Sequence, residues 1–294
     1  MKKPVFTGSA AALVTPFRGD KIDYEKPDQL IEYHIQNGTD AVVVCATTGE
    51  SCTQTAEEHL IAIDRAVQTA AGRIKIIGST GSNDTAHALM MSKNAQSYGV
   101  DGLLMVTPYY NKTTQRGLIA HYTWLADRLE VPIILYNVPS RTGVGFHPDT
   151  YAELAKHPNI NGVKECVLSN VCKTLSTVEE GQFYVWSGND EEIVPMMSIG
   201  AKGVISVLAN ICPRETKRLC DLALAGDFVQ AGKMQVAYTK LIEALFCEVN
   251  PIPVKTAMNL MGFDVGNLRL PLYDMSPANL QFLTDTLKEY QLLK

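Results

Sequence analysis

Short apolar runs alternate along the chain with longer segments in which apolar residues recur at helical spacing. Apolar runs of this kind are typical of parallel strands that are covered on both faces, and the longer periodic segments are typical of helices. Eight runs fit the strand pattern, at residues 8–15, 41–44, 76–79, 102–106, 133–137, 160–164, 183–187 and 203–206. We therefore expect eight short, buried strands.

The segments between these runs predict helices, at residues 27–36, 56–71, 85–98, 117–128 and 149–155. Residues 56–71 show the pattern most clearly, with one apolar stripe formed by Leu60, Ile63, Val67 and Ala71. No GxGxxG pattern follows the first run, which disfavours a dinucleotide-binding domain. A strand followed by a helix, repeated eight times, predicts an α/β fold of the (β/α)8 TIM-barrel type.

The chain continues beyond the eighth strand–helix unit. Three further helices are predicted there, at residues 228–248, 253–260 and 277–292. This region is too short for a comfortable core of its own, so it should pack on the barrel. We expect a barrel over residues 1–225 and an appended helical region over residues 226–294.

Composition excludes several classes of partner. The 294 residues carry a net charge of −5, which gives no basic face for nucleic acid or an anionic membrane. No apolar stretch is long enough to span a bilayer, and no long apolar segment follows the first lysines as in a secretory signal. The seven cysteines include no CxxC pair, so neither a zinc site nor a disulfide framework is indicated. We expect reduced, small core cysteines in a cytoplasmic protein.

Polar clusters follow several of the predicted strands. They are residues 47–51, 109–111 and 136–141, together with Lys164, which ends the sixth run. The carboxyl ends of the strands are where a parallel barrel collects its chemistry. An amine must be neutral to attack a ketone, and burial disfavours the charged form, which is how Schiff-base lysines are activated. Lys164 is thus a candidate nucleophile, although a surface lysine at a strand end would look the same.

The other polar residues allow two interpretations each. Tyr136 ends the neighbouring strand and could pass protons near Lys164, or it could be a core tyrosine with a satisfied hydroxyl. Thr47 and Thr48 could hold a small carboxylate, or they could cap the following helix. Arg141 could grip a carboxylate in a bidentate way, or it could be solvated.

These motifs together resemble the dihydrodipicolinate synthase branch of the N-acetylneuraminate lyase superfamily, which contains class I pyruvate aldolase-like enzymes. The resemblance extends over nearly the whole chain in family order. Its motifs are Gly8-Ser9, Thr15-Pro16-Phe17, Thr47-Thr48-Gly49-Glu50-Ser51, Val106-Thr107-Pro108-Tyr109-Tyr110-Asn111, Tyr136-Asn137-Val138-Pro139-Ser140-Arg141-Thr142-Gly143, Gly162-Val163-Lys164-Glu165, Ser187-Gly188-Asn189-Asp190 and Asn250-Pro251-Ile252-Pro253-Val254-Lys255.

The resemblance implies a role for each matching catalytic residue. Lys164 matches the lysine that forms a Schiff base with pyruvate. Tyr136, Thr47 and Tyr110 match a proton relay in which the last of these reaches in from a neighbouring subunit. The implied assembly is a homotetramer built as a dimer of dimers, with no metal or organic cofactor.

The resemblance also implies how two substrates are held. Thr48 matches the contact to the pyruvate carboxylate, and Arg141 matches the contact to the carboxylate of L-aspartate 4-semialdehyde. Gly188 and Ile205 match positions that line the pyruvate site. The implied product is 4-hydroxy-tetrahydrodipicolinate, which leads to diaminopimelate and lysine.

Two alternatives come from other functions. The first is an N-acetylneuraminate lyase or a 2-keto-3-deoxy sugar acid aldolase, which shares the lysine and the tyrosine; Arg141 together with the Tyr109-Tyr110 pair favours the synthase. The second is a barrel that binds a keto acid as a sensor. Such a sensor is expected to lose Lys164 or Tyr136, and the chain has both.

A further expectation concerns feedback inhibition by lysine. In inhibited relatives the effector lies at a dimer interface, and the residues here that match that site are Ser51, His59, Asn83 and Tyr109. Ala56 stands where those relatives have a histidine, and His87 stands where they have the glutamate that holds the ammonium group of the effector. We therefore expect weak inhibition or none.

Overall fold

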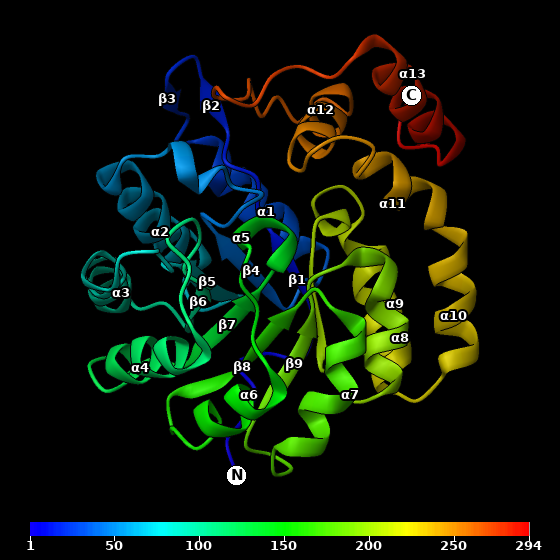
Figure 1. Ribbon diagram of the computed structural model, residues 1–294. Helices are drawn as coiled ribbons and strands as arrows, with labels where there is room; N and C mark the ends of the chain where they lie inside the picture. Colours follow the sequence, from blue (N-terminus) through cyan, green and yellow to red (C-terminus); the bar gives the residue numbers. More distant parts are fainter. Residues whose placement is uncertain (294) are drawn as a thin grey trace.

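The computed structural model, which describes residues 1–293, contains a closed barrel of eight parallel strands (Figure 1). The order around the barrel is β1, β4, β5, β6, β7, β8, β9, β10, and β10 closes on β1. The predicted (β/α)8 barrel is confirmed. The strands are β1 (Gly8–Ala12), β4 (Ala41–Val44), β5 (Lys75–Ser79), β6 (Gly102–Val106), β7 (Ile133–Asn137), β8 (Ile160–Glu165), β9 (Tyr184–Ser187) and β10 (Gly203–Ser206).

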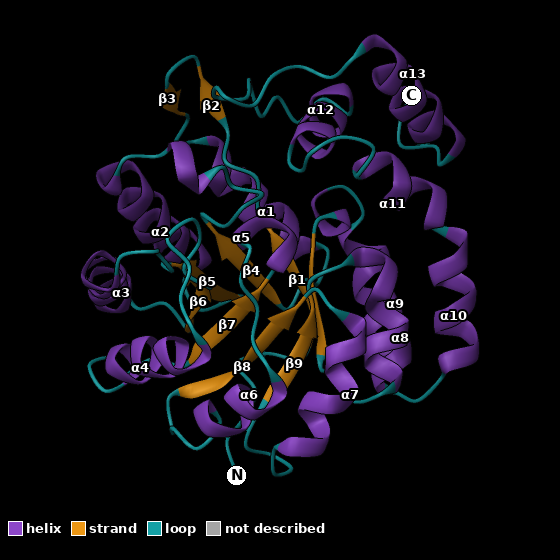
Figure 2. Cartoon of the chain, in the orientation of Figure 1, coloured by secondary structure: helices purple, strands orange, loops and turns teal. Residues whose placement is uncertain are grey.

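Helices surround the strands on the outside of the barrel, as Figure 2 shows in purple and orange. They are α1 (Lys26–Gln36), α2 (Ala56–Ala70), α3 (Thr85–Tyr98), α4 (Gln115–Ala126), α6 (Pro148–Leu154), α7 (Leu168–Thr177), α8 (Ile193–Ser198) and α9 (Pro213–Leu224). Helix α2 begins at a capping box, in which Thr55 and Glu58 satisfy each other's backbone N–H groups. Its buried face is displaced from the predicted stripe and consists of His59, Ala62, Ile63, Ala66 and Ala70.

Three short elements were not predicted. The hairpin of β2 (Phe17–Arg18) and β3 (Lys21–Ile22) follows the first barrel strand, and the single turn α5 (Pro139–Thr142) follows β7. Elements of two to four residues show no periodicity, so the hydrophobic pattern cannot reveal them.

The core has two layers, because successive residues of a barrel strand point alternately inward and outward. The inner layer fills the barrel and includes Tyr136, Trp186 and Ile205. The outer layer lies between the strands and the helices and includes Leu135 and Val163. Both layers consist mostly of fully buried aliphatic side chains.

The C-terminal helices are α10 (Phe228–Ala237), α11 (Thr239–Leu245), α12 (Ile252–Leu260) and α13 (Pro277–Glu289). The prediction of one helix over residues 228–248 is wrong, since the helix is interrupted at Tyr238, between α10 and α11. The hydroxyl of Tyr290 donates to the carbonyl of Ala237 at 2.6 Å, and the rings of Tyr238 and Tyr290 pack together. This tertiary contact takes the place of a helical hydrogen bond at the break.

The C-terminal helices extend along one side of the barrel and over the end where β2 and β3 lie, away from the N-terminus (Figure 1). Helix α10 packs on α8 and α9, and α11, α12 and α13 pack on one another. The division of the chain after residue 225 stays a prediction.

The cysteine prediction is partly wrong. Cys45, Cys212 and Cys220 are buried, but Cys52 and Cys172 are exposed, and all seven are free thiols. Cys52 lies in a single 3-10 turn (Ser51–Thr53), and Cys172 is an exposed position of α7. The apolar residues beside them in the sequence do not reveal this exposure. In residues 1–293 no helix is long and apolar enough to cross a membrane.

Glu165 joins two strands and a helix at the carboxyl end of the barrel. Its buried carboxylate accepts hydrogen bonds from Asn137 Nδ2 at 2.8 Å, from the Tyr151 hydroxyl at 2.9 Å, and from the backbone N–H groups of Cys166 and Val167 at 3.0 Å. These donors lie on β7, on α6 and just after β8. Burial raises the pKa of Glu165 to about 7, and the four hydrogen bonds oppose that shift only in part.

This raised pKa predicts a pH dependence of stability. Between the ordinary glutamate pKa and about 7, folded Glu165 keeps a proton that the unfolded chain loses, so its contribution to stability falls as pH rises through this range. A glutamine does not titrate, so this pH-dependent contribution to stability is absent in Glu165→Gln. We expect the free energy of unfolding of the unsubstituted protein, relative to Glu165→Gln, to decrease by up to about 1.4 kcal/mol per pH unit. Urea unfolding from about pH 5 to about pH 8 measures this, and parallel pH profiles would contradict it.

Candidate active site

A cavity of about 360 Å³ opens at the carboxyl end of the strands. Its walls come from the segments that follow β4, β5, β6 and β7. Three of the predicted catalytic and substrate-binding residues line it: Thr47, Tyr136 and Arg141. The polar clusters that follow separate strands in the sequence therefore meet in one place.

Lys164 and Tyr136 lie opposite each other on paired strands. The β7–β8 register places them side by side, and Lys164 Nζ lies 4.5 Å from the centroid of the Tyr136 ring. Both are buried, with 5% and 6% of their surfaces exposed. Within residues 1–293, Lys164 makes no salt bridge, unlike the buried Lys255. The interpretation of Lys164 as a surface lysine is wrong, and its amine has an aromatic neighbour instead of a carboxylate.

Gly188 packs directly against this pair. A Cβ atom at Gly188 would lie 2.3 Å from Cys166 Sγ and 3.0 Å from Lys164 Cε, so a larger residue would push the lysine aside. Ile205 is fully buried on β10, in the same inner cluster as Tyr136. Lys164, Gly188 and Ile205 do not line the cavity itself; Tyr136 connects them to it because it contacts Lys164 and forms part of the wall.

Thr47 and Thr48 lie in a tight turn after β4. The backbone N–H of Glu50 donates to the carbonyl of Thr47 at 3.1 Å, and Glu50 has a left-handed φ of 56°. Thr48 is buried, and its hydroxyl accepts a hydrogen bond from Asn250 Nδ2 at 3.0 Å. The interpretation of these threonines as helix caps is wrong, because Thr55 caps α2.

Arg141 lies in the turn α5 at the mouth of the cavity. It is exposed, and its Nη2 donates to the carbonyl of Asn250 at 3.2 Å. The other guanidinium donors make no hydrogen bond with the part of the protein that the structure describes. The hydrogen bond to Asn250 thus orients the guanidinium, and its remaining N–H groups are available to an acidic ligand.

Tyr109 and Tyr110 differ in exposure and in whether they line the cavity. Tyr109 is half-buried and lines the cavity, whereas Tyr110 is 92% exposed and does not. Tyr110 also has a φ of 67°, which is a costly conformation for a residue with a side chain. Within one chain, Tyr110 is therefore not part of the site, and its role in a neighbouring subunit stays a prediction.

Four of the five candidate effector residues line the same cavity: Ser51, His59, His87 and Tyr109. Asn83 lines a separate hollow with Asn111, whose side chain donates to the Asn83 carbonyl. His59 is buried and hydrogen-bonds the carbonyl of Ser79 at 2.7 Å. Burial lowers the pKa of His59 to about 4, so it is neutral near pH 7. Neither histidine supplies a negative charge here.

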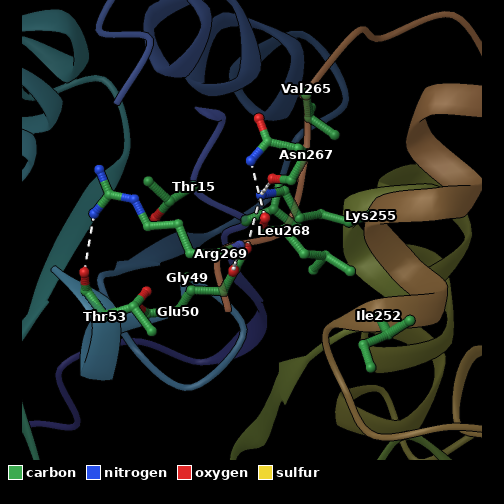
Figure 3. Close-up of polar contacts among 12 residues, drawn as sticks. Thr15, Gly49, Glu50, Thr53, Ile252, Lys255, Val265, Asn267, Leu268 and Arg269 are labelled. Carbon is green, nitrogen blue, oxygen red and sulfur yellow. Dashed lines mark hydrogen bonds and ion pairs between the residues drawn. The ribbon is translucent and has the colours of Figure 1, made fainter. Parts of the chain in front are cut away.

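The structure adds a polar cluster from the C-terminal region that the sequence did not assign to the site. Figure 3 shows Glu50 next to Lys255 and Arg269. The carboxylate of Glu50 accepts from Lys255 Nζ at 2.7 Å and from the backbone N–H of Arg269 at 3.0 Å. Both hydrogen bonds of the Glu50 carboxylate thus come from the C-terminal region and none from the amides of its own turn. Lys255 lies 205 positions away, so no local pattern reveals the pair.

No group of three or more His, Cys, Asp or Glu side chains in residues 1–293 is arranged to hold a metal ion. The groups that the site presents are the buried amine of Lys164, the hydroxyls of Thr47 and Tyr136, and the guanidinium of Arg141. An amine beside a phenol can form and hydrolyse imines, and the guanidinium and hydroxyls can hold carboxylates.

Comparison with known proteins supports this chemistry. The model of the dihydrodipicolinate synthetase family matches residues 5–290. A 4-hydroxy-tetrahydrodipicolinate synthase from Thermoanaerobacter pseudethanolicus is 52% identical over 293 residues, which cover 99% of both chains. The crystal structure of dihydrodipicolinate synthase from Aquifex aeolicus is 48% identical, has a TM-score of 0.96, and is matched over 98% of this chain and 99% of that one.

A third similar protein carries a ligand. The chloride-inhibited dihydrodipicolinate synthase from Acinetobacter baumannii, which was crystallised with pyruvate, is 40% identical with a TM-score of 0.94; the match covers 98% of this chain and 99% of that one. The family model and these relatives all extend over almost the full length. The chain belongs to the dihydrodipicolinate synthetase family.

Proposed function

We propose that the chain condenses pyruvate with L-aspartate 4-semialdehyde to give 4-hydroxy-tetrahydrodipicolinate, as its relatives' names describe. The observation that carries this proposal is the buried pair of Lys164 and Tyr136 at the ends of neighbouring strands. The relatives that match the full chain are named as synthases, which supports condensation over the cleavage of a sugar acid. No observation on the site favours that alternative.

The proposed reaction starts at the Lys164 amine. Its nitrogen attacks C2 of pyruvate, and loss of water gives an imine. Loss of a proton from C3 gives an enamine, which forms a carbon–carbon bond to the aldehyde carbon of the second substrate. The amino group of that substrate then attacks the imine carbon, which closes the ring and releases Lys164. Each step moves a proton, and Tyr136, whose ring lies 4.5 Å from the amine, carries a hydroxyl that can serve this transfer.

The proton relay and the substrate contacts are assigned by position. Thr47 lines the cavity beside Tyr136, and Tyr110 would complete the relay from a second copy of the chain. Thr48 and the turn amides would hold the pyruvate carboxylate, and Gly188 and Ile205 would leave room for its small body. The homotetramer that the resemblance implies is proposed as the assembly, and the exposed Tyr110 with its left-handed φ supports contact with at least one further copy of the chain.

The proposed nucleophile is tested by trapping the imine. We expect borohydride to reduce a pyruvate adduct onto the protein and Lys164→Ala to abolish that adduct, as measured by intact mass. Lys75→Ala is the matched control, because Lys75 lies at the opposite end of a barrel strand and is solvent-exposed. An adduct of undiminished yield in Lys164→Ala would sink the assignment.

Arg141 should act on the second substrate. Arg141→Ala removes a charge-assisted hydrogen bond worth about 1.5–3 kcal/mol, so we expect KM for the aldehyde to rise by about 10- to 150-fold. KM for pyruvate should change little. Steady-state kinetics with each substrate varied separately measures both. Arg214→Ala, an exposed arginine on α9, serves as the control. A change in KM for pyruvate alone would show that Arg141 does not bind the aldehyde substrate.

Inhibition by lysine should be weak or absent at millimolar concentration. The ammonium group of lysine needs an anion to replace its hydration, but the cavity wall has Ala56, neutral His59 and exposed His87 at the matching positions. Each 1.4 kcal/mol of lost contact weakens binding by about tenfold. His87→Glu should increase inhibition, whereas His147→Glu, outside the cavity, should not. Inhibition of the unsubstituted protein at micromolar lysine would refute this.

A further inference from the structure

Lys255 brings a buried positive charge from the C-terminal region to the Thr47–Thr48 turn. It lies on α12 and is 1% exposed. Its Nζ donates to Glu50 Oε1 at 2.7 Å and to the carbonyl of Asn267 at 2.6 Å, and it lies 4.3 Å from the centroid of the Phe17 ring. Glu50 and Asn267, which Figure 3 shows around Lys255, lie outside the barrel strands, and Phe17 belongs to the hairpin of β2 and β3.

Both oxygens of the Glu50 carboxylate are held from the C-terminal region. One accepts from Lys255 Nζ and the other from the backbone N–H of Arg269. Glu50 is also the residue of the turn with a left-handed φ of 56°. A residue with a side chain keeps such a conformation only where surrounding contacts hold it, so these two contacts fix the backbone of the turn.

Three further residue pairs link the same parts of the chain. Asn250 Nδ2 donates to the hydroxyl of Thr48, and the guanidinium of Arg269 donates to both oxygens of Glu58 at 2.8 and 2.6 Å. Arg269 also donates to the carbonyl of Thr53 at 2.9 Å. The segment from Thr48 to the start of α2 is therefore bound to the C-terminal region at several points.

The position of the turn determines where the two threonines point. The N–H of Glu50 donates to the carbonyl of Thr47, so a change in the Glu50 backbone moves Thr47 and Thr48 directly. A buried ion pair alone is weak evidence for a stabilising role, because desolvation offsets much of its attraction. An ion pair attached to a strained residue beside the site has a more specific consequence, which is geometric.

We infer that Lys255 and Glu50 are positioning residues for the reaction at Lys164. The pair holds the turn so that Thr47 and Thr48 face the substrate, and it makes the C-terminal helical region a part of the active site. This inference rests on the proposed function, since it concerns the rate at which pyruvate reacts with the lysine.

The test compares Glu50→Gln/Lys255→Met with the unsubstituted protein. The double substitution removes both charges, so no unpaired charge stays buried as it would in Lys255→Met alone. We expect the double variant to fold, as judged by Tm and circular dichroism, and to form the borohydride-trapped pyruvate adduct about 10- to 100-fold more slowly, since a small misplacement of a binding group has effects of this size. KM for pyruvate should rise as well.

A control variant and a second test variant separate a positioning role from an effect on stability. Lys240→Met/Glu289→Gln removes an exposed ion pair of the same C-terminal region and should leave the adduct rate unchanged. Glu50→Asp keeps the charge but shortens the side chain by one methylene, so the turn must shift to keep its partner. It should also slow adduct formation by about tenfold or more, and it gives the answer where the double variant does not fold.

The outcomes are distinct. A folded double variant, or a folded Glu50→Asp, that forms the adduct at the unsubstituted rate would overturn the positioning role and leave the proposed function intact. Absence of any pyruvate adduct in the unsubstituted protein would overturn the proposed function, and this inference with it.

Discussion

The fixed register of neighbouring strands in a closed barrel is the constraint on which the site depends. Barrel closure leaves each strand with two partners, so the β7–β8 pairing places Tyr136 opposite Lys164. The same pairing places Asn137 opposite Glu165 on the outer face, where the amide and carboxylate are hydrogen-bonded. Inward residues at this level carry the chemistry, and outward residues one position later hold the strand ends together.

The C-terminal region supplies the contacts that hold one of the loops of the site. The barrel supplies the amine, the phenol and the threonine turn, but the turn is held in place by Asn250, Lys255 and Arg269. A loop that follows a strand is free to adopt many conformations, and its catalytic value depends on contacts that select one of them. Here these contacts come from residues about two hundred positions later in the chain.

Much of the fold was predictable because parallel strands and their helices leave strong local patterns. The runs at residues 41–44, 102–106, 133–137 and 203–206 match β4, β6, β7 and β10 at both ends. The break at Tyr238 was not predictable, because it is accompanied by a contact with Tyr290, which follows α13 far along the chain. The hairpin of β2 and β3 and the turn α5 were missed because they are too short for periodicity.

The site was predictable to a similar degree. Lys164 and Tyr136 lie near the carboxyl ends of their strands and Thr47 follows its strand, where a barrel places its chemistry, and the resemblance to a family implied a role for each. The partner of Glu50 could not be inferred, because long-range ion pairs leave no signal in one sequence. The place of Tyr110 in a neighbouring subunit stays a prediction, since its side chain is exposed and does not line the cavity of its own chain.

Peptide mapping shows which lysine forms the imine with pyruvate. The protein is incubated with pyruvate, reduced with borohydride, digested and analysed by tandem mass spectrometry. We expect the added mass on Lys164 alone. Modification of a different lysine, such as Lys255, or of none, would contradict this expectation.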